Sequence, residues 1–127
     1  MPRREWLAGL AVVIVCAACG GDSPGTPSPN PSNPFAITIS SGGVVSPKEL
    51  TVPPGARVLF VNSHSRRHDM ASDPHPDHLD CPELNQVAVL NPGQSRESEN
   101  LVIVRSCGFH DHDEPTNVNL RGTIIIR

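Results

Sequence analysis

Aromatic side chains and basic charge are both scarce in this chain of 127 residues. It has no Tyr, only three Phe and a single Trp, and Trp6 lies in the N-terminal leader rather than in the domain that follows. Without Arg3, Arg4 and Glu5 of that leader, eight basic and twelve acidic residues leave a net charge of −4. Nucleic-acid binding relies on a cationic surface and often on stacking aromatics. We therefore expect no nucleic-acid partner.

The apolar run near the N-terminus is too short to cross a bilayer. It covers residues 7–18, twelve residues, whereas a membrane-spanning helix needs about 20. Two arginines precede it and small residues lead up to Cys19, which is typical of an export signal. The segment around Cys19 resembles a bacterial lipobox, which implies a lipoprotein-type signal peptide over residues 1–19 and lipidation of Cys19. Cys16 stands where the lipobox prefers Leu, and the alternative is an ordinary signal cleaved nearby.

Two further segments follow the signal. Residues 20–34 form a Pro/Ser/Gly-rich linker with five prolines, a composition that cannot bury a core and serves as a tether. Residues 35–127 are enough for one small domain. We expect this domain to be exported to the periplasm or cell envelope and held at the membrane by a lipid on Cys19. Its two cysteines, Cys81 and Cys107, could form one disulfide in an oxidising compartment.

The domain has no helical hydrophobic period. Short apolar runs alternate with turn signals such as Pro53-Pro54-Gly55 and Asn91-Pro92-Gly93. The expected strands cover residues 36–39, 49–52, 57–61, 87–90, 101–104 and 123–126. Six or more strands at this spacing predict an all-β, antiparallel β-sandwich. Residues 63–85 hold four of the six histidines and almost no apolar run, and we expect them to form a loop that is either functional or disordered.

Several segments together resemble the cupredoxins, the blue-copper proteins. Residues 46–62 are similar to the opening strands of that family, with His68 in the following loop, and residues 91–95 are similar to its penultimate hairpin. Cys107-Gly108-Phe109-His110 and the Gly-containing residues 120–126 resemble its closing segment. The resemblance covers nearly all of residues 35–127. It implies a Greek-key sandwich of the cupredoxin type with copper as cofactor.

The same resemblance assigns the metal ligands. It implies that His68 and Cys107 bind copper, with His110 or His112 as the third ligand, because both spacings from the cysteine occur in the family. A thiolate and two imidazoles suit copper in both of its oxidation states. Leu120 stands where the family often has an axial Met, which implies a three-coordinate site.

Other histidines leave the metal chemistry open. His75 and His78 alternate with Pro and Asp before Cys81, a pattern that fits either metal ligands or an ordinary hydrophilic loop. The aspartates there could instead fix imidazole tautomers. His64 precedes two arginines and is expected to be a solvated side chain.

Two functions follow from these patterns. The first is a non-enzymatic electron carrier with a Cys/His copper centre, monomeric and served by a redox partner protein. The second is a histidine-only site for copper or another metal, used in binding or delivery, with Cys81 and Cys107 joined in a disulfide. A metal-free interaction domain is a third possibility. A catalytic role is not expected, because no Ser/His/Asp or paired-carboxylate arrangement stands out.

Overall fold

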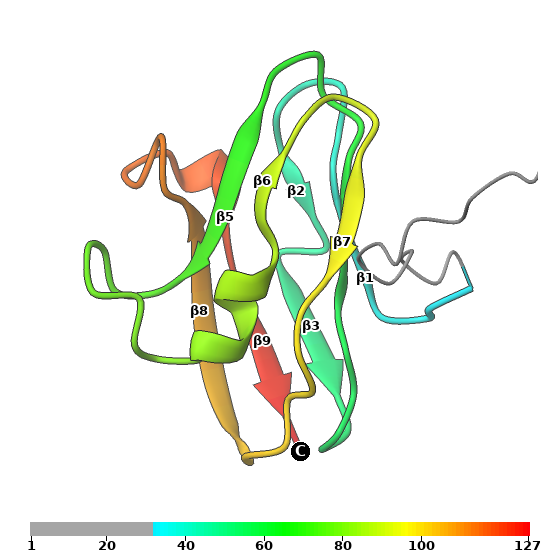
Figure 1. The fold of residues 1–127 in the computed structure, drawn as a ribbon, viewed down its shortest axis with the longest axis vertical. Coiled ribbons are helices and arrows are strands. Elements are labelled where there is room, and N and C mark those ends of the chain that lie inside the picture. Colours follow the sequence, from blue (N-terminus) through cyan, green and yellow to red (C-terminus); the bar gives the residue numbers. More distant parts are fainter. Residues whose placement is uncertain (1–31) are drawn as a thin grey trace, which may run out of the picture.

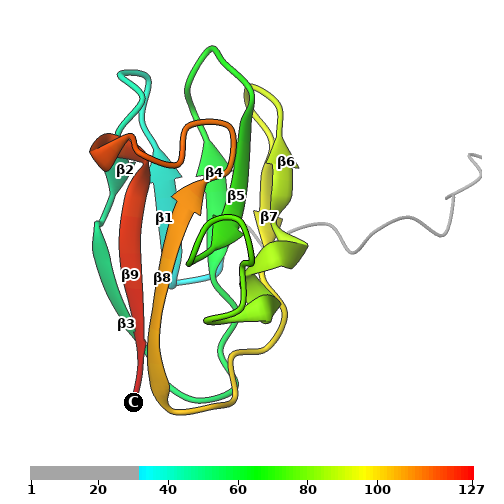
Figure 2. The same cartoon turned by 90° about the vertical axis from the view of Figure 1, so that its left-hand side faces the viewer.

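Two β-sheets pack face to face in the computed structural model, which describes residues 32–127 (Figures 1 and 2). The expected signal peptide, Cys19 and most of the 20–34 linker lie outside the described residues. Within the described part of the chain, no helix has the length and apolar character needed to cross a membrane.

The first sheet has four strands in the order β2-β1-β4-β7. Its strands are β1 (Ala36–Ile39), β2 (Val45–Ser46), β4 (Leu59–Asn62) and β7 (Ser95–Glu97). The second sheet has five strands in the order β3-β9-β8-β5-β6. Its strands are β3 (Glu49–Val52), β5 (His68–Ser72), β6 (Ala88–Leu90), β8 (Arg105–Asp111) and β9 (Arg121–Ile126). Within the described residues, two short 3-10 helices accompany the sheets, η1 (Pro82–Gln86) and η2 (Val118–Leu120).

The all-β sandwich predicted from the sequence is confirmed, with one correction to strand direction. Both sheets are mixed rather than purely antiparallel, because β1 runs parallel to β4 and β3 runs parallel to β9. The remaining pairs, including β5 with β8 and β8 with β9, are antiparallel. A parallel pair requires a crossover connection, and here the chain crosses between the two layers to make each one.

One strand and one loop expected from the sequence are wrong. Residues 101–104 are not a strand: Leu101 is buried and makes one bridge to Ala56, and Val102, Ile103 and Val104 are exposed. The strand of this region begins at Arg105, where pairing with β9 starts. Residues 63–85, expected to be loop throughout, contain β5 and η1.

The core lies between the sheets and follows the two-residue period of the strands. Ile37 and Ile39 of β1 and Ile124 and Ile126 of β9 point inward and are fully buried. Phe60 of the first sheet meets Phe109 of the second edge to face, with ring centroids 5.3 Å apart. This packing fixes β8, which carries His110 and pairs with β5, the strand that begins at His68.

Candidate metal centre

The course of β8 decides which of its side chains can share a site. The strand continues without a break from Arg105 to Asp111, so successive side chains point to opposite faces of the sheet. Cys107, Phe109 and Asp111 point into the sandwich, and Gly108 and His110 point to its outer side. Cys107 and His110 therefore lie on opposite faces, although three residues separate them in sequence.

Cys107 forms a disulfide with Cys81, the residue just before η1. The Cα atoms are 5.6 Å apart, and both residues are fully buried in the core. The resemblance to cupredoxins makes Cys107 a thiolate ligand, but in this structure it provides no thiolate. The closing segment explains the difference. The cysteine and the following histidine were expected on one tight loop, and they lie instead within a continuous strand.

His68 also lies away from His110 and His112, on the inner side of the second sheet. It is buried, and its Nδ1 is 2.6 Å from Oδ2 of Asp111, which is buried as well. Its Nε2 is 2.8 Å from Nδ1 of His64, so His64 has a specific partner and is not simply solvated. Asp111 Oδ1 accepts hydrogen bonds from the backbone N–H groups of Asp69 and Asp113. A carboxylate, not a thiolate, therefore stands beside His68.

Four other imidazoles converge on the outer face of the second sheet. The residues are His75, His78, His110 and His112, and one ring nitrogen from each lies within 4.8 Å of those of the other three. His110 is buried, His78 is half-buried, and the other two are exposed. The set is the one group of this kind found within residues 32–127. Imidazole nitrogens at such spacing can all bind one transition-metal ion.

The segment of residues 73–81 follows β5 and leads to η1 (Figure 1). It places the rings of His75 and His78 5.5 and 5.1 Å from the His110 ring of β8, measured between centroids. Its ends are fastened by two backbone hydrogen bonds, from Asp73 N–H to Gly108 C=O at 2.9 Å and from Asp80 N–H to Asp73 C=O at 2.8 Å. Gly108 is required here, because a Cβ on it would collide with the side chain of Asp73. The loop is thus held close to the strand that carries His110.

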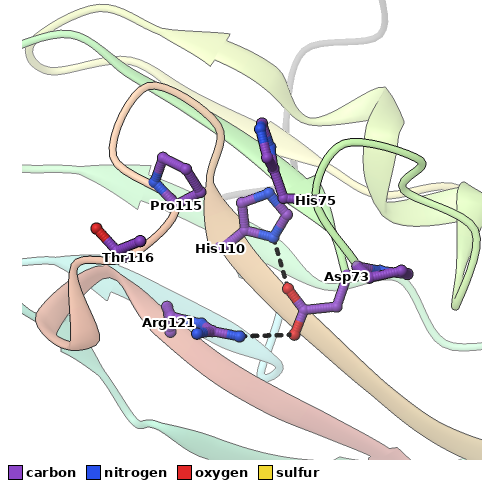
Figure 3. Close-up of a pocket in the computed structure, with 7 residues that line it drawn as sticks. Asp73, His75, His110, Pro115, Thr116 and Arg121 are labelled. Carbon is purple, nitrogen blue, oxygen red and sulfur yellow. Dashed lines mark hydrogen bonds and ion pairs between the residues drawn. The ribbon is translucent and has the colours of Figure 1, made fainter.

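His110 is oriented by Asp73. Its Nδ1 is 2.5 Å from Oδ1 of Asp73, whose other oxygen is 3.5 Å from Nη2 of Arg121 (Figure 3). The carboxylate accepts, so the Nδ1–H of His110 donates and its Nε2 carries the free lone pair. This Nε2 is buried and has no hydrogen-bond partner. A buried imidazole nitrogen with no partner is costly unless something binds it, and a metal ion would do so.

His78 is oriented in the same way by the backbone. Its Nδ1 donates to the carbonyl oxygen of Ser72 at 2.7 Å, which leaves the lone pair on Nε2. Nε2 lies 2.9 Å from Nδ1 of His112. The carbonyl oxygen of His78 accepts from the side-chain amide of Asn85 at 3.0 Å, and this contact fixes the loop. Metal-binding histidines usually have their second ring nitrogen held by such a partner.

The surroundings of His75 lower the pKa of its ring. Loss of hydration lowers the pKa of His75, and the nearby His112, His110 and His78 lower it further. Asp77 acts in the opposite direction, but the net shift is downward. A metal ion binds the neutral form of imidazole, so His75 is in the binding form at neutral pH.

The structure brings together His110 and His112, the two alternatives for the third ligand, and separates them from His68 and Cys107. His75 and His78, left open by the sequence, complete the group instead. The sequence feature that could have identified them is their alternation with Pro and Asp. The same pattern is equally typical of an ordinary polar loop. Leu120 lies in the hydrophobic core.

Comparison with solved structures identifies the fold. A purple cupredoxin from Nitrosopumilus maritimus matches with a TM-score of 0.56 and 20% identity, over 72% of this chain and 98% of that one. Oxidized plastocyanin from Dryopteris crassirhizoma gives 0.56 and 18%, over 72% and 99%. Amicyanin from Paracoccus versutus gives 0.59 and 16%, over 77% and 85%. No family model and no curated protein matches the chain. The chain therefore has the cupredoxin fold.

Proposed function

We propose that the protein binds a single copper ion through His75, His78, His110 and His112. The observation that carries this proposal is the convergence of four ring nitrogens, one of them the buried and unpartnered Nε2 of His110. Asp73 and the Ser72 carbonyl hold two of the rings in the tautomer that a metal requires. The residues present therefore fit a metal ion.

Copper is favoured among the transition metals for two reasons. Imidazole sites bind divalent first-row metals in an order that peaks at copper. The fold also supports copper, since a solved amicyanin structure with the same fold is described in its Cu(I) form. Copper bound at such a site supplies one-electron redox chemistry.

The ligand set makes a blue-copper centre unsuitable for this chain. That kind of centre needs a cysteine thiolate, and Cys107 is joined to Cys81. The histidine-only alternative considered from the sequence is therefore preferred to a Cys/His centre, and binding or delivery of copper is its simplest use. Asp73 and the 73–81 loop hold the ligands in place, and His75 and His112 remain accessible for metal exchange.

Copper titration of the full chain and of matched histidine variants tests the proposal. We expect one Cu(II) per chain, a weak visible absorption, and a large loss of affinity in His110→Ala. His64→Ala is the matched control, because His64 is a histidine outside the cluster, and it should keep wild-type affinity. Equal affinities in both variants and the wild type would overturn the proposal.

Electron transfer is a second use of the same site. The observation in its favour is the fold, since plastocyanin structures with it are described in oxidized and reduced forms. The chain would then pass one electron to and from a redox partner protein as a monomer. Reversible one-electron voltammetry with copper retained in both states supports this use, and loss of copper on reduction favours delivery.

We also propose a place for the protein in the cell envelope. The support comes from the sequence alone: an export signal, the lipobox-like cysteine at position 19 and the Pro-rich tether of residues 20–34. A lipid on Cys19 would hold the copper-binding domain near the membrane surface.

A further inference from the structure

A hollow opens beside His75 and His110 on the outer face of the second sheet (Figure 3). Its volume is about 420 Å³, and besides the two imidazoles it is lined by Asp73, Pro74, Pro115, Thr116 and Arg121. The unpartnered Nε2 belongs to His110, one of these lining residues. The hollow therefore lies next to two of the four proposed copper ligands, His75, which is exposed, and His110, which is buried.

Strand pairing places a guanidinium in this hollow. Arg121 is the register partner of His110 across β8 and β9, so the two side chains leave the sheet on the same face as neighbours. The Arg121 side chain is 46% exposed, which keeps it accessible to solutes. Within residues 32–127 it forms an ion pair with Asp73, with 3.5 Å between Nη2 and Oδ2.

The carboxylate of Asp73, which also lines the hollow, already contacts two side chains. Asp73 contributes its one carboxylate, with Oδ1 on the His110 ring and Oδ2 toward Arg121. The guanidinium has five N–H donors in a planar fork and keeps most of them after this single long contact. Arg121 can therefore bind an anion while Asp73 continues to orient His110.

A second hollow beside the cluster has carboxylates but no cationic side chain in its lining. This hollow of about 360 Å³ lies against His78 and His112, and its charged side chains are the carboxylates of Asp69 and Asp77. An anion is repelled by these two carboxylates, whereas beside Arg121 the single carboxylate of Asp73 is offset by the guanidinium. The hollow of Arg121 is therefore the more favourable of the two for an anion.

We propose that the hollow of Arg121 binds a small inorganic anion beside the histidine cluster, with the guanidinium as its main donor. Thr116 also lines this hollow and offers a hydroxyl donor. This inference rests on the proposed copper site, because the anion would lie next to its ligands. The chemical class is a small anion with acceptor atoms that fit a guanidinium fork.

Azide is the probe for the test. The reduced, Cu(I)-loaded full chain is titrated with azide, followed by the NMR shift of the Thr116 backbone amide, and separately with imidazole as a neutral ligand. Arg121→Gln should lower the affinity for azide about tenfold and leave the affinity for imidazole unchanged. Arg121→Lys should lose less of its affinity for azide. Arg66→Gln is the control, because Arg66 is an exposed arginine that pairs with Glu114, and it should match the wild type.

Two results would overturn the inference. One is equal azide affinity in Arg121→Gln and the wild type; the other is an equal loss for azide and imidazole, which would indicate a structural role only. Copper stoichiometry is measured first, so that failure of the copper site is seen separately.

If no copper binds, azide is added to the metal-free chain and the Arg121 Nε–Hε resonance is followed by NMR. A shift supports the anion site, and an unchanged resonance overturns it.

Discussion

Asp73 links three parts of the site through one carboxyl group. It orients the His110 ring, contacts Arg121 and packs against Gly108, and its backbone begins the loop that carries His75. Asp73→Asn should weaken copper binding about 10–100-fold, the usual effect of losing a partner that orients a metal ligand. Asp80→Asn is the matched control, because Asp80 is an exposed aspartate of the same loop, and it should have little effect. Isothermal titration gives both affinities, and equal values would contradict the role of Asp73.

His75 provides a test of the electrostatics of the cluster without metal. Its pKa is lowered by desolvation and then by His112, His110 and His78, and it is raised by Asp77. The His75 ring should therefore titrate below the value of about 6.5 for a free histidine. His112→Ala should raise this pKa, and Asp77→Asn should lower it further. NMR titration of the His75 ring measures each value, and a wild-type pKa at or above that of free histidine would contradict the account.

The lowered pKa of His75 also determines how the stability of the metal-free protein changes with pH. Between the lowered folded pKa and the ordinary value, the unfolded chain binds more protons than the folded chain. The contribution of His75 to stability is therefore complete above a pH of about 6.5 and is lost as the pH falls toward its folded pKa. Denaturation of the metal-free protein across this range should show stability that decreases with acidification.

At the scale of elements, the disulfide joins the start of η1 to the middle of β8. It closes a segment with a sequence separation of 26, for which the chain-entropy relation gives about 3.5 kcal/mol. Reduction, or the double variant C81S/C107S, should lower the free energy of unfolding by about this amount. The double variant should then be insensitive to reductant. Free thiols at both positions in the native protein, located by labelling and peptide mass, would contradict this prediction.

The elements also show how far the sequence could predict the structure. The sandwich was predictable because turn signals and alternating apolar residues define most of its strands. β8 was misplaced, because Leu101-Val102-Ile103-Val104 has the stronger β-branched run, while the strand itself, residues 105–111, includes Arg, Ser, Gly, His and Asp. Its polar residues partly serve the site on the outer face, which hides the usual hydrophobic pattern.

The site could be predicted only in part, for a related reason. A Cys followed by His three and five residues later fits a ligand loop, but the spacing does not reveal whether the chain turns there or continues as a strand. In a strand, Cys107 and His110 must face opposite sides of the sheet. The residues that join His110 come from a loop more than 30 positions earlier, and only the folded structure brings them together.

At the scale of the whole molecule, the proposed metal site lies on the outer face of one sheet of the sandwich, and the proposed lipid anchor is Cys19. Mass spectrometry of the native protein should find a mature chain that begins at Cys19 and carries acyl chains. Cys19→Ala should remove the acyl chains and release the protein from the detergent phase on partitioning. A mature chain that begins at another residue without lipid would contradict the anchor.

The central claim is that imidazoles alone bind the copper. X-ray absorption at the copper edge of the loaded, oxidised full chain tests it most directly, because it identifies the atoms bound to the metal. The account predicts a shell of nitrogen or oxygen atoms, with the outer-shell scattering of imidazole rings and no sulfur. A copper–sulfur shell would show that Cys107 or another sulfur binds the metal, and it would contradict the four-histidine centre.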